Sequence, residues 1–429
     1  MQSILREALD SFARENQPER PITPTSHAFS DILNETMRRQ PNDDNEILSI
    51  LHKSKPKIQV IGIGGAGNNA VHRLSQSIDP SVEVEIIAIN TDAQDLLSTS
   101  AHKKLLIGTE VTRGFGAGND PTVGESAAKE SFEQLKHMID GDLVFITCGL
   151  GGGTGTGAAH VAAGIAKEHG ALAISVCTLP FRMEGPVRLE NASKGLRKLY
   201  DSSDTVIVIP NEKLLKLNSN ITIVTAFKIA DEVLVRAVKA ITELITKPQM
   251  INVDFADVRK VLADGGVALI GLGSTSSQNE KVKEAVNDAL KNPLLDDIDL
   301  PSARKALICV MGGQDLELKD AEQVVARIAS EIDPDAEIIW GASIQPDLGS
   351  NLRVIAILSD VQSTFTRQDI STLNQAETIR SLLDEFPSMF ENRDSSMANY
   401  KAAKAELLPK KLLDRSKDRN SRKKRFGVF

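Results

Sequence analysis

A glycine-rich loop in the first half of the chain has residue types suited to binding phosphate. It reads GLGGGTGTG, from Gly149 to Gly157, and follows the apolar run DLVFITC. Six of its nine residues are glycine, so successive backbone N–H groups can converge on one anion, and the Thr154 and Thr156 hydroxyls can donate to its oxygens. A turn alone needs one or two glycines, so the loop predicts a phosphate chain as its ligand.

A second glycine loop lies upstream, where the apolar run KIQVIGIG passes into GGAGNN. Gly62, Gly64 and Gly67 have the G-x-G-x-x-G spacing of dinucleotide-binding turns, and Asp92 follows the next apolar run. This spacing predicts backbone N–H groups and a helix N-terminus that face a phosphate. The alternative is a tight strand-to-helix turn without a ligand.

Together the two loops predict a di- or triphosphate held from two sides, because both follow strand-like runs of one sheet. The chain contains no G-x-x-x-x-G-K-[ST], which excludes the Walker-type NTPases. The candidate contacts are Gly65, Ala66, Gly67, Asn68, Asn69, Gly151, Gly152, Gly153, Thr154, Gly155 and Thr156.

The elements that position these loops alternate between apolar runs and helix-length periodic segments. The first runs are KIQVIGIG, VEIIAIN, KLLIG, DLVFITCG, LAISVCTLP and TVIVIP. This alternation is typical of an α/β fold with a parallel, doubly wound sheet and helices on both faces. Beyond them, residues 222–246 predict one long helix buried on more than one side. Four later runs predict a second, mixed α/β domain: VALIGLG, KALICVMGG, EIIWGASI and LRVIAIL.

We expect five parts in the chain. They are an N-terminal extension at 1–55, largely outside the core; a nucleotide-binding domain at 56–221; a central helix at 222–248; a second α/β domain at 249–359; and a linker and basic tail at 360–429, partly disordered.

Composition argues against a membrane-spanning or exported protein. The 429 residues are 41% hydrophobic and 25% charged. No apolar run reaches the roughly 18–20 residues of a membrane-spanning helix, and the start of the chain does not resemble a signal peptide. We therefore expect a cytoplasmic protein without direct membrane insertion. Cys148, Cys177 and Cys309 lie in apolar runs without metal-ligand spacing, which indicates buried, reduced thiols and no protein-bound metal site.

The net charge of −8 is unevenly distributed. Residues 410–429 hold nine Lys or Arg against two Asp, so the rest of the chain carries a net charge near −15. An acidic body argues against nucleic acid as a partner, because the phosphate backbone requires a basic face. The basic end RKKRFGVF is either a solvated charge run or a contact for anionic lipid or another protein.

GGGTGTG is the tubulin-type signature, and the chain resembles the FtsZ family of bacterial tubulin-like division GTPases. The resemblance extends from about Lys57 to Leu358, and the family's motifs occur in order. They are GIGGAGNNAV, AINTDAQ, TRGFGAG, CGLGGGTGTGAA, PFRMEG, VIPNEKLL, AFKIADEVL, INVDFADV and NPLLDDID. The resemblance implies a tubulin-like fold, in which a GTP-binding domain is joined by the central helix to the second domain.

The ligand that the resemblance implies is GTP or GDP, with nucleotide-associated Mg²⁺. Asp231 lies where the family places a carboxylate that accepts two adjacent donors of guanine, and Asn211 would present its amide to O6 and N7. Phe227, one helical turn before Asp231, would stack on the base. Glu184 and Arg188 match the family's ribose and phosphate contacts. Taken singly, Asp231 or Glu184 would more often be a solvated charge on a helix or loop. Their roles at the nucleotide are implied by the whole ordered set of family motifs.

A second polar set, Asn252, Asp254 and Asp257, has N-x-D-x-x-D spacing. One interpretation is a helix N-cap with a first-turn acid, although capping by itself needs only one of these residues. The resemblance implies instead that this loop inserts into the nucleotide pocket of the neighbouring subunit. There Asp254 and Asp257 would be catalytic by orienting and polarising the attacking water, with Asn252 assisting, at the joints of a head-to-tail homopolymer.

The chain departs from the family pattern at several positions. The usual GAGANP is GAGNDP, which places Asp120 near the γ-phosphate, where it would weaken nucleotide binding or help to hold Mg²⁺. His160 replaces a usual proline, and Pro186-Val187 replaces a basic pair. The family's C-terminal adaptor peptide is absent in its usual form, and ELLPKKLL is a loose analogue. The resemblance to the family still implies that membrane-adaptor division proteins bind the C-terminal tail.

The sequence thus predicts a GTPase that polymerises head to tail and forms the cytokinetic ring at mid-cell in bacterial cell division. One alternative is a tubulin-like filament GTPase that serves DNA segregation or cell shape. A more distant alternative is a dinucleotide-dependent oxidoreductase built on the first glycine loop. That enzyme would not need GGGTGTG, and it would need a catalytic His, Lys or Tyr in the second domain.

Overall fold

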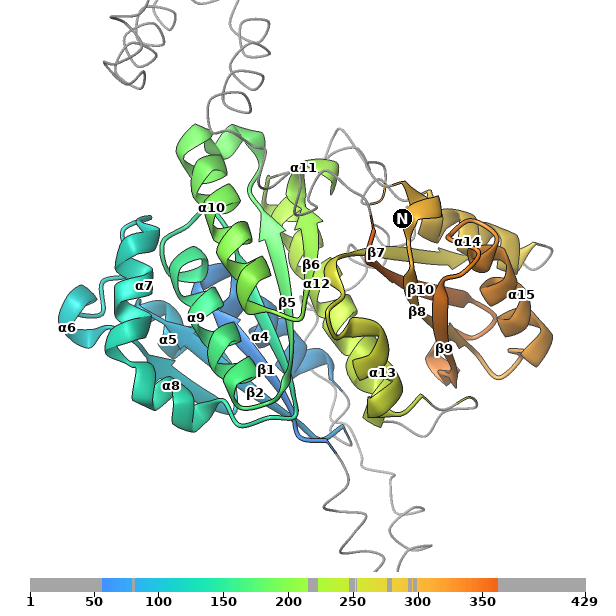
Figure 1. The fold of residues 1–429 in the computed structure, drawn as a ribbon, viewed down its shortest axis with the longest axis horizontal. Coiled ribbons are helices and arrows are strands. Elements are labelled where there is room, and N and C mark those ends of the chain that lie inside the picture. Colours follow the sequence, from blue (N-terminus) through green and yellow to red (C-terminus); the bar gives the residue numbers. More distant parts are fainter. Residues whose placement is uncertain are drawn as a thin grey trace, which may run out of the picture. The chain divides into compact units, whose positions relative to one another are not determined.

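The structure is a computed structural model that describes residues 56–78, 82–214, 223–246, 251, 253–275, 280–291, 295 and 299–361. The expected N-terminal extension at 1–55 lies outside the described residues, as do the tail beyond residue 361 and Asn252. The element labels of Figure 1 therefore begin with β1 and α4.

A ten-stranded sheet forms the framework of the fold, and each apolar run of the sequence is one of its strands. In chain order they are β1 (Ile58–Ile63), β2 (Val84–Asn90), β3 (Lys103–Leu106), β4 (Leu143–Gly149), β5 (Leu172–Leu179), β6 (Thr205–Pro210), β7 (Gly266–Thr275), β8 (Lys305–Gly312), β9 (Glu337–Ile344) and β10 (Leu352–Ser359). Their order across the sheet is β3-β2-β1-β4-β5-β6-β7-β10-β8-β9.

The pairing directions confirm the predicted doubly wound, parallel first half. Neighbours from β3 to β7 are all parallel, whereas β10 is antiparallel to both β7 and β8. The strands of the two expected domains belong to one sheet, because β6 and β7 pair in parallel over three residues. The second half is mixed, since β8 and β9 are again parallel.

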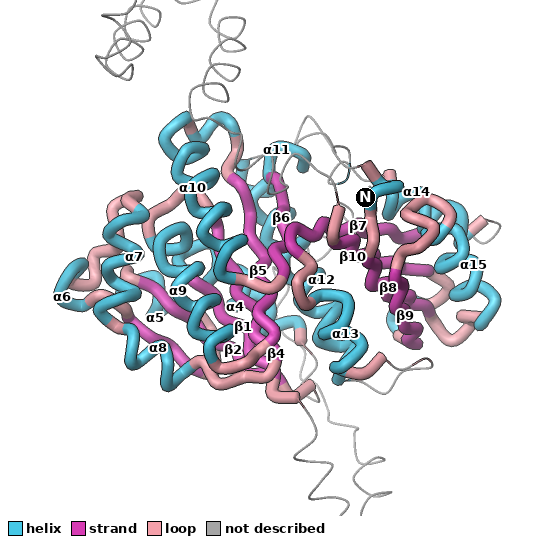
Figure 2. Tube along the Cα trace, in the orientation of Figure 1, coloured by secondary structure: helices cyan, strands magenta, loops and turns pink. Residues whose placement is uncertain are grey.

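Helices cover both faces of this sheet, as Figures 1 and 2 show. The described helices are α4 (Gly64–Ser77), α5 (Ala93–Ser98), α6 (Thr109–Thr112), α7 (Pro121–Glu130), α8 (Phe132–Met138), α9 (Thr154–Glu168), α10 (Pro186–Ser202), α11 (Asn211–Leu214), α12 (Ile223–Thr246), α13 (Phe255–Leu262), α14 (Lys281–Leu290) and α15 (Leu318–Ala329), with 3₁₀ turns η1 (Arg182–Glu184), η4 (Leu300–Ser302) and η5 (Pro346–Leu348).

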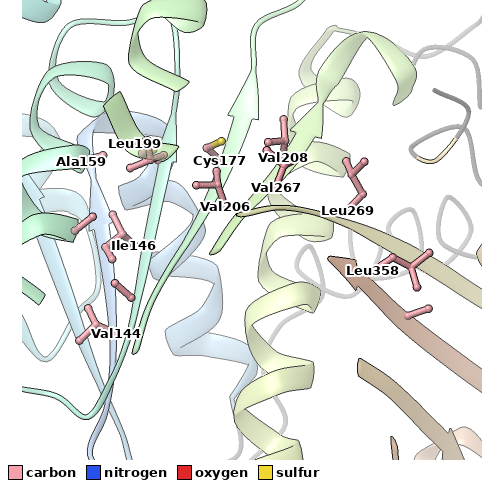
Figure 3. Packing of buried hydrophobic residues seen from close by; sticks show 14 of the residues in the cluster. Val144, Ile146, Ala159, Cys177, Leu199, Val206, Val208, Val267, Leu269 and Leu358 are labelled. Carbon is pink, nitrogen blue, oxygen red and sulfur yellow. The ribbon is translucent and has the colours of Figure 1, made fainter. Parts of the chain in front are cut away.

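Two apolar layers hold the helices to the sheet, because successive strand side chains point to opposite faces. One layer joins the strands to α7–α10, α14 and α15, and the other joins them to α4, α12 and α13. Figure 3 shows part of the first layer, with Val144 and Ile146 of β4 on the side of Ala159 and Leu199. Parallel strands buried on both faces explain why these segments are continuous apolar runs.

The long helix α12 has the predicted position and length, at Ile223–Thr246. Its buried residues, among them Ile229, Val233 and Ile241, belong to the second apolar layer. Near its end, Leu244 contacts strand β9, where a Cβ on Gly341 would lie 2.5 Å from Leu244 Cδ1. The helix therefore contacts strands of both halves of the sheet.

Candidate functional site

The two glycine loops meet at the carboxyl ends of β1 and β4, which are neighbours in the sheet. Helix α4 begins at Gly64, directly after β1, and helix α9 begins at Thr154, with four residues between it and the end of β4. A Cβ on Gly64, whose φ is +70°, would lie 2.8 Å from the backbone N of Gly155, and a Cβ on Gly149 would lie 2.6 Å from Ala66 Cβ. The two loops therefore touch, and the N-termini of both helices open on the same side.

The glycines of these loops have two different roles. Gly67, Gly153 and Gly155 allow close packing, because a Cβ there would lie 2.3 Å from Thr147 O, 2.7 Å from Ala117 Cβ and 2.6 Å from Gly149 O, respectively. Gly65 and Gly152 leave room for a side chain instead, because the nearest atoms to a Cβ there are 3.8 and 3.9 Å away, at ordinary van der Waals distance. Gly65 and Gly152 are thus where the backbone can approach a ligand.

Several polar side chains of the loops shape the protein rather than face a ligand. Thr156 is buried and accepts the N–H of Gly151 at 2.8 Å. Asn68 is fully buried, with its amide between the side chains of Asp95 and Asn90. The Thr154 hydroxyl is half-buried and bonds to the Thr91 hydroxyl at 2.7 Å. Ala66 and Asn69, by contrast, are exposed beside Gly65.

A third loop borders the second glycine loop and contains the unusual Asp120. This residue is the N-cap of α7: its carboxylate accepts both the N–H and the hydroxyl of Thr122, at 2.8 and 2.7 Å. These hydrogen bonds lower the pKa of Asp120. Asn191 of α10 donates to the carbonyls of Asn119 and Gly151, at 3.3 Å each, and so ties the third loop to the second. Helix capping thus accounts for an acid at position 120.

The residues expected to read a base are placed by α11 and α12. Asn211 begins α11, is 4% exposed, and its Oδ1 has no hydrogen-bond partner in the part of the chain that the structure describes. Phe227 is 40% exposed and packs edge-on against Phe181, with ring centroids 5.1 Å apart. An unpaired buried acceptor and an exposed ring are features that a planar, hydrogen-bonding ligand would satisfy.

Asp231 lies one helical turn after Phe227, and its side chain is 14% exposed. Burial raises the pKa of Asp231 to about 6, while the Arg73 guanidinium, with Nε 3.6 Å from Asp231 Oδ2, opposes that rise. Arg73 belongs to α4, and the sequence analysis did not find it. Its partner is distant in sequence, and only the packing of α4 on α12 brings the two together.

Glu184 and Arg188 form an ion pair at the start of α10. Glu184 also accepts the N–H of Phe181 at 2.8 Å, which fixes the turn that precedes the helix. The Arg188 side chain is 45% exposed, and its backbone adjoins the second glycine loop, where a Cβ on Gly151 would lie 3.0 Å from Arg188 O. Phe181, which supports Phe227, was also missed, although it lies in the PFRMEG motif.

The two candidate catalytic acids form a capping box at the start of α13. Asp254 accepts the N–H of Asp257 at 2.8 Å, and Asp257 accepts the N–H of Asp254 at 3.4 Å. The cap uses both acids, so the expectation that capping needs only one of them is wrong. Both side chains are exposed, and Asn252, the third member of the set, lies outside the described residues.

Helix α13 is anchored at the opposite ends of the strands from the glycine loops. Arg259 donates to Gly170 O, just before β5, at 3.0 Å, and Lys305 at the start of β8 donates to Ala263 O at 3.0 Å. Both contacts lie at the amino ends of strands, whereas the glycine loops follow carboxyl ends. The two ends are far apart, because the eight residues of β5, at about 3.3 Å per residue, span about 26 Å. Figure 1 accordingly shows α11, after the carboxyl end of β6, on the upper side and α13 on the lower.

No helix within the described ranges is long and apolar enough to span a membrane.

Comparison with known proteins gives consistent matches over both halves of the chain. The Tubulin/FtsZ family GTPase domain matches residues 57–219, and the FtsZ family C-terminal domain matches residues 266–362. The curated "Cell division protein FtsZ 1" of Methanocaldococcus jannaschii is 53% identical over 329 residues, which are 76% of this chain and 89% of the relative. The protein of the same name from Thermococcus kodakarensis is 50% identical over 77% of this chain and 87% of the relative.

Solved structures of tubulin-like proteins also match the chain. The empty FtsZ dimer of M. jannaschii is 52% identical, with a TM-score of 0.70 over 75% of this chain and 92% of that one. The GDP-bound CetZ1 monomer of Haloferax volcanii, at 22% identity and a TM-score of 0.65 over 75% of this chain and 99% of that one, shares the fold. These FtsZ relatives are archaeal, so the matches extend beyond the bacterial members named in the sequence analysis. The chain belongs to the FtsZ family of tubulin-like, filament-forming cell-division GTPases.

Proposed function

We propose that GTP binds with its phosphates between the two glycine loops and its base between Asn211, Phe227 and Asp231. The observation that carries this proposal is the contact of the two loops, which leaves room at Gly65 and Gly152 beside two helix N-termini. Anions bind at such termini because the N–H groups are unpaired and the helix dipole is positive there. Arg188 supplies a side-chain cation at the same loop.

The base-reading role of Asp231 follows from the chemistry of guanine. N1–H and the 2-amino group are adjacent donors, and a carboxylate offers two adjacent acceptors. Asn211 Oδ1 is an acceptor without a partner in the described part of the chain, and its amide can turn to meet either kind of group on the base. Phe227, supported by Phe181, offers a ring face on which the base can stack.

We propose further that the acids Asp254 and Asp257 complete the nucleotide site of a neighbouring copy. They are exposed, and their helix is anchored at the opposite ends of the strands from the glycine loops. Exposed apolar residues flank the loops, with Phe115 86%, Met183 68% and Val187 60% exposed, and such residues fit a surface that a second copy covers. A heterologous contact of this kind repeats without closing, which gives a filament.

In that joint the acids would act on water. Their carboxylates accept hydrogen bonds from a water molecule and orient its oxygen toward the γ-phosphorus, while the two loops hold the phosphate oxygens. The Mg²⁺ of this proposal is carried by the nucleotide, because Mg²⁺ keeps several waters and binds substrate phosphates rather than a dedicated cage of protein ligands. When bound, Mg²⁺ neutralises charge on the phosphoryl oxygens.

The setting of this reaction is also a proposal. The relatives are cell-division proteins, so we infer that filaments of this chain act in the cytoplasm, as a ring at the mid-cell division site. We place the contact with membrane-adaptor division proteins in the C-terminal tail, which lies outside the described residues.

Changing Asp231 to Asn is expected to exchange base specificity. An Asn amide offers one donor and one acceptor, which match O2 and N1–H of xanthine rather than the two donors of guanine. We expect the affinity for GDP to fall by about 100-fold and that for xanthosine diphosphate to exceed it, since a mispaired donor costs about 1–3 kcal/mol. Nucleotide titration measures both.

The matched control is Glu232→Gln, one residue further along α12, where Glu232 is paired with Arg236 at 2.7 Å. At pH 8.5, where Asp231 is ionised in both proteins, that variant should bind GDP as the unchanged protein does. Unaltered GDP affinity in Asp231→Asn would refute the placement of the base.

A further inference from the structure

We propose that Arg73 is a positioning residue for guanine recognition: from helix α4 it holds the Asp231 carboxylate ionised and oriented toward the base. This inference rests on the proposed base-reading role of Asp231. It assigns a function to a residue that lies on the helix of the first glycine loop.

The geometry is a partly buried ion pair between two long helices. Arg73 Nε lies 3.6 Å from Asp231 Oδ2, and the two side chains are 29% and 14% exposed. Below them, Val71, Leu74 and Val233 belong to one buried apolar layer that fixes α4 against α12. Because both helices are fixed by this layer, the backbone positions of Arg73 and Asp231 are held beside each other.

A hydrogen bond joins the same two helices at a second point, away from Asp231. Lys239 of α12 donates to the backbone carbonyl of Ser77, the last residue of α4, at 2.9 Å. Lys239 lies two helical turns beyond Asp231, so it holds the helices together without contributing to the carboxylate. This separation makes Lys239 a structural control for Arg73.

Among the charged groups around Asp231, Arg73 is the one that lowers the pKa of its carboxyl group. Burial and the charge of Glu232 raise the pKa of Asp231, and the charge of Arg73 lowers it. Strands β5 and β6 present apolar side chains to α12, such as Val176 and Ile207. The other charged or titratable side chains on α4, α11 and α12 are Lys228, Arg236, Lys239 and Glu243 on α12, Glu212 and Lys213 on α11, and His72 on α4.

These other groups have their own partners. Glu232 pairs with Arg236, Glu212 accepts the N–H of Arg182 at 2.9 Å, and His72 Nδ1 accepts the N–H of Ser100 at 2.9 Å. Lys213 and Lys228 also make interactions of their own.

Ionisation matters because guanine offers two donors to this position. A protonated carboxyl group would set its own O–H against one of them, so that one hydrogen bond is lost and a donor is left unpaired. An acid ionises above its pKa, so guanine affinity should fall as the pH drops through the pKa of Asp231, about 6. Without the Arg73 charge this fall should begin at a higher pH.

The test is the pH dependence of GDP affinity, from pH 5.5 to 8.5, in the unchanged protein, Arg73→Met and Arg73→Lys. If removing the charge raises the midpoint by about one pH unit, affinity in Arg73→Met falls about eightfold at pH 5.5, about threefold at pH 6.5 and not measurably at pH 8.5. Arg73→Lys, which keeps the charge, should follow the unchanged protein closely. Titration of the nucleotide phosphates is common to all variants and cancels in their ratio.

Lys239→Met separates a positioning role from helix packing, and it should leave the midpoint where it is. Should Arg73→Met fail to fold, Arg73→Gln provides a neutral side chain that can still form hydrogen bonds. An equal loss of affinity at every pH, or no loss at all, would overturn the role of Arg73. The proposed function fails separately, if Asp231→Asn binds GDP with unchanged affinity at every pH.

Discussion

GTP turnover in an Asp254→Asn variant is expected to be lower by about 100-fold or more, with GTP binding unchanged. Removal of a group that orients or activates the attacking water typically costs 10²–10⁴ in rate. The nucleotide loops of the same chain lie at the other ends of the strands, so binding should not respond. Phosphate release and a nucleotide titration measure the two quantities.

Asparagine is chosen because Asp254 also caps helix α13. Asn is as good an N-cap as Asp, so the substitution removes the carboxylate charge and keeps the cap. The matched control is Glu317→Gln, in the capping box of α15 with Asp320, which should retain full turnover. If Asp254→Asn were active and only Asp254→Ala inactive, the acid would be a helix cap and nothing more.

A Gly152→Ala variant should fold normally and lose most of its affinity for GTP. The nearest protein atom to a Cβ at this position is 3.9 Å away, so the folded chain accommodates the methyl group. In the proposed site, the backbone approaches the phosphates through that space, so we expect the affinity for GTP to fall by about 100-fold, or about 2.7 kcal/mol. A thermal melt and a GTP titration test the two halves of the prediction.

Gly164→Ala, further along α9, is the control for this substitution. A Cβ at Gly164 also meets nothing within 4 Å, but the position is two to three helical turns from the loop. It should bind GTP normally and gain about 0.5–1 kcal/mol of stability, because Ala is the better helix former. GTP affinity that is unchanged in Gly152→Ala would mean that the phosphates do not pass Gly152.

Strands and the long helix could be predicted because their signals are local. A parallel strand buried on both faces must be apolar throughout, and TVIVIP coincides with β6, whose six residues are all buried. The order of the strands has no such local signal. Nothing in LRVIAIL indicates that β10 inserts between β7 and β8, because that position depends on pairing partners far along the chain.

In the candidate site, too, local features could be predicted from the sequence and features that depend on packing could not. The motifs located both glycine loops, but residue types alone did not indicate which glycines leave room for a side chain. Thr156 and Asn68 have side chains suited to phosphate and are buried as supports, because loop packing decides where a side chain points. Arg73 could not be found, since its significance depends on Asp231 in a helix distant in sequence.

If GTP is hydrolysed at joints between copies of this chain, turnover per molecule must depend on assembly. The most direct test is the rate of phosphate release per molecule as a function of protein concentration, with GTP, Mg²⁺ and K⁺ in excess. We expect little phosphate release below a threshold concentration and a steep rise above it, together with sedimentable filaments. A rate per molecule that is constant across the whole concentration range would show that one chain carries a complete active site and that hydrolysis does not need a neighbouring copy.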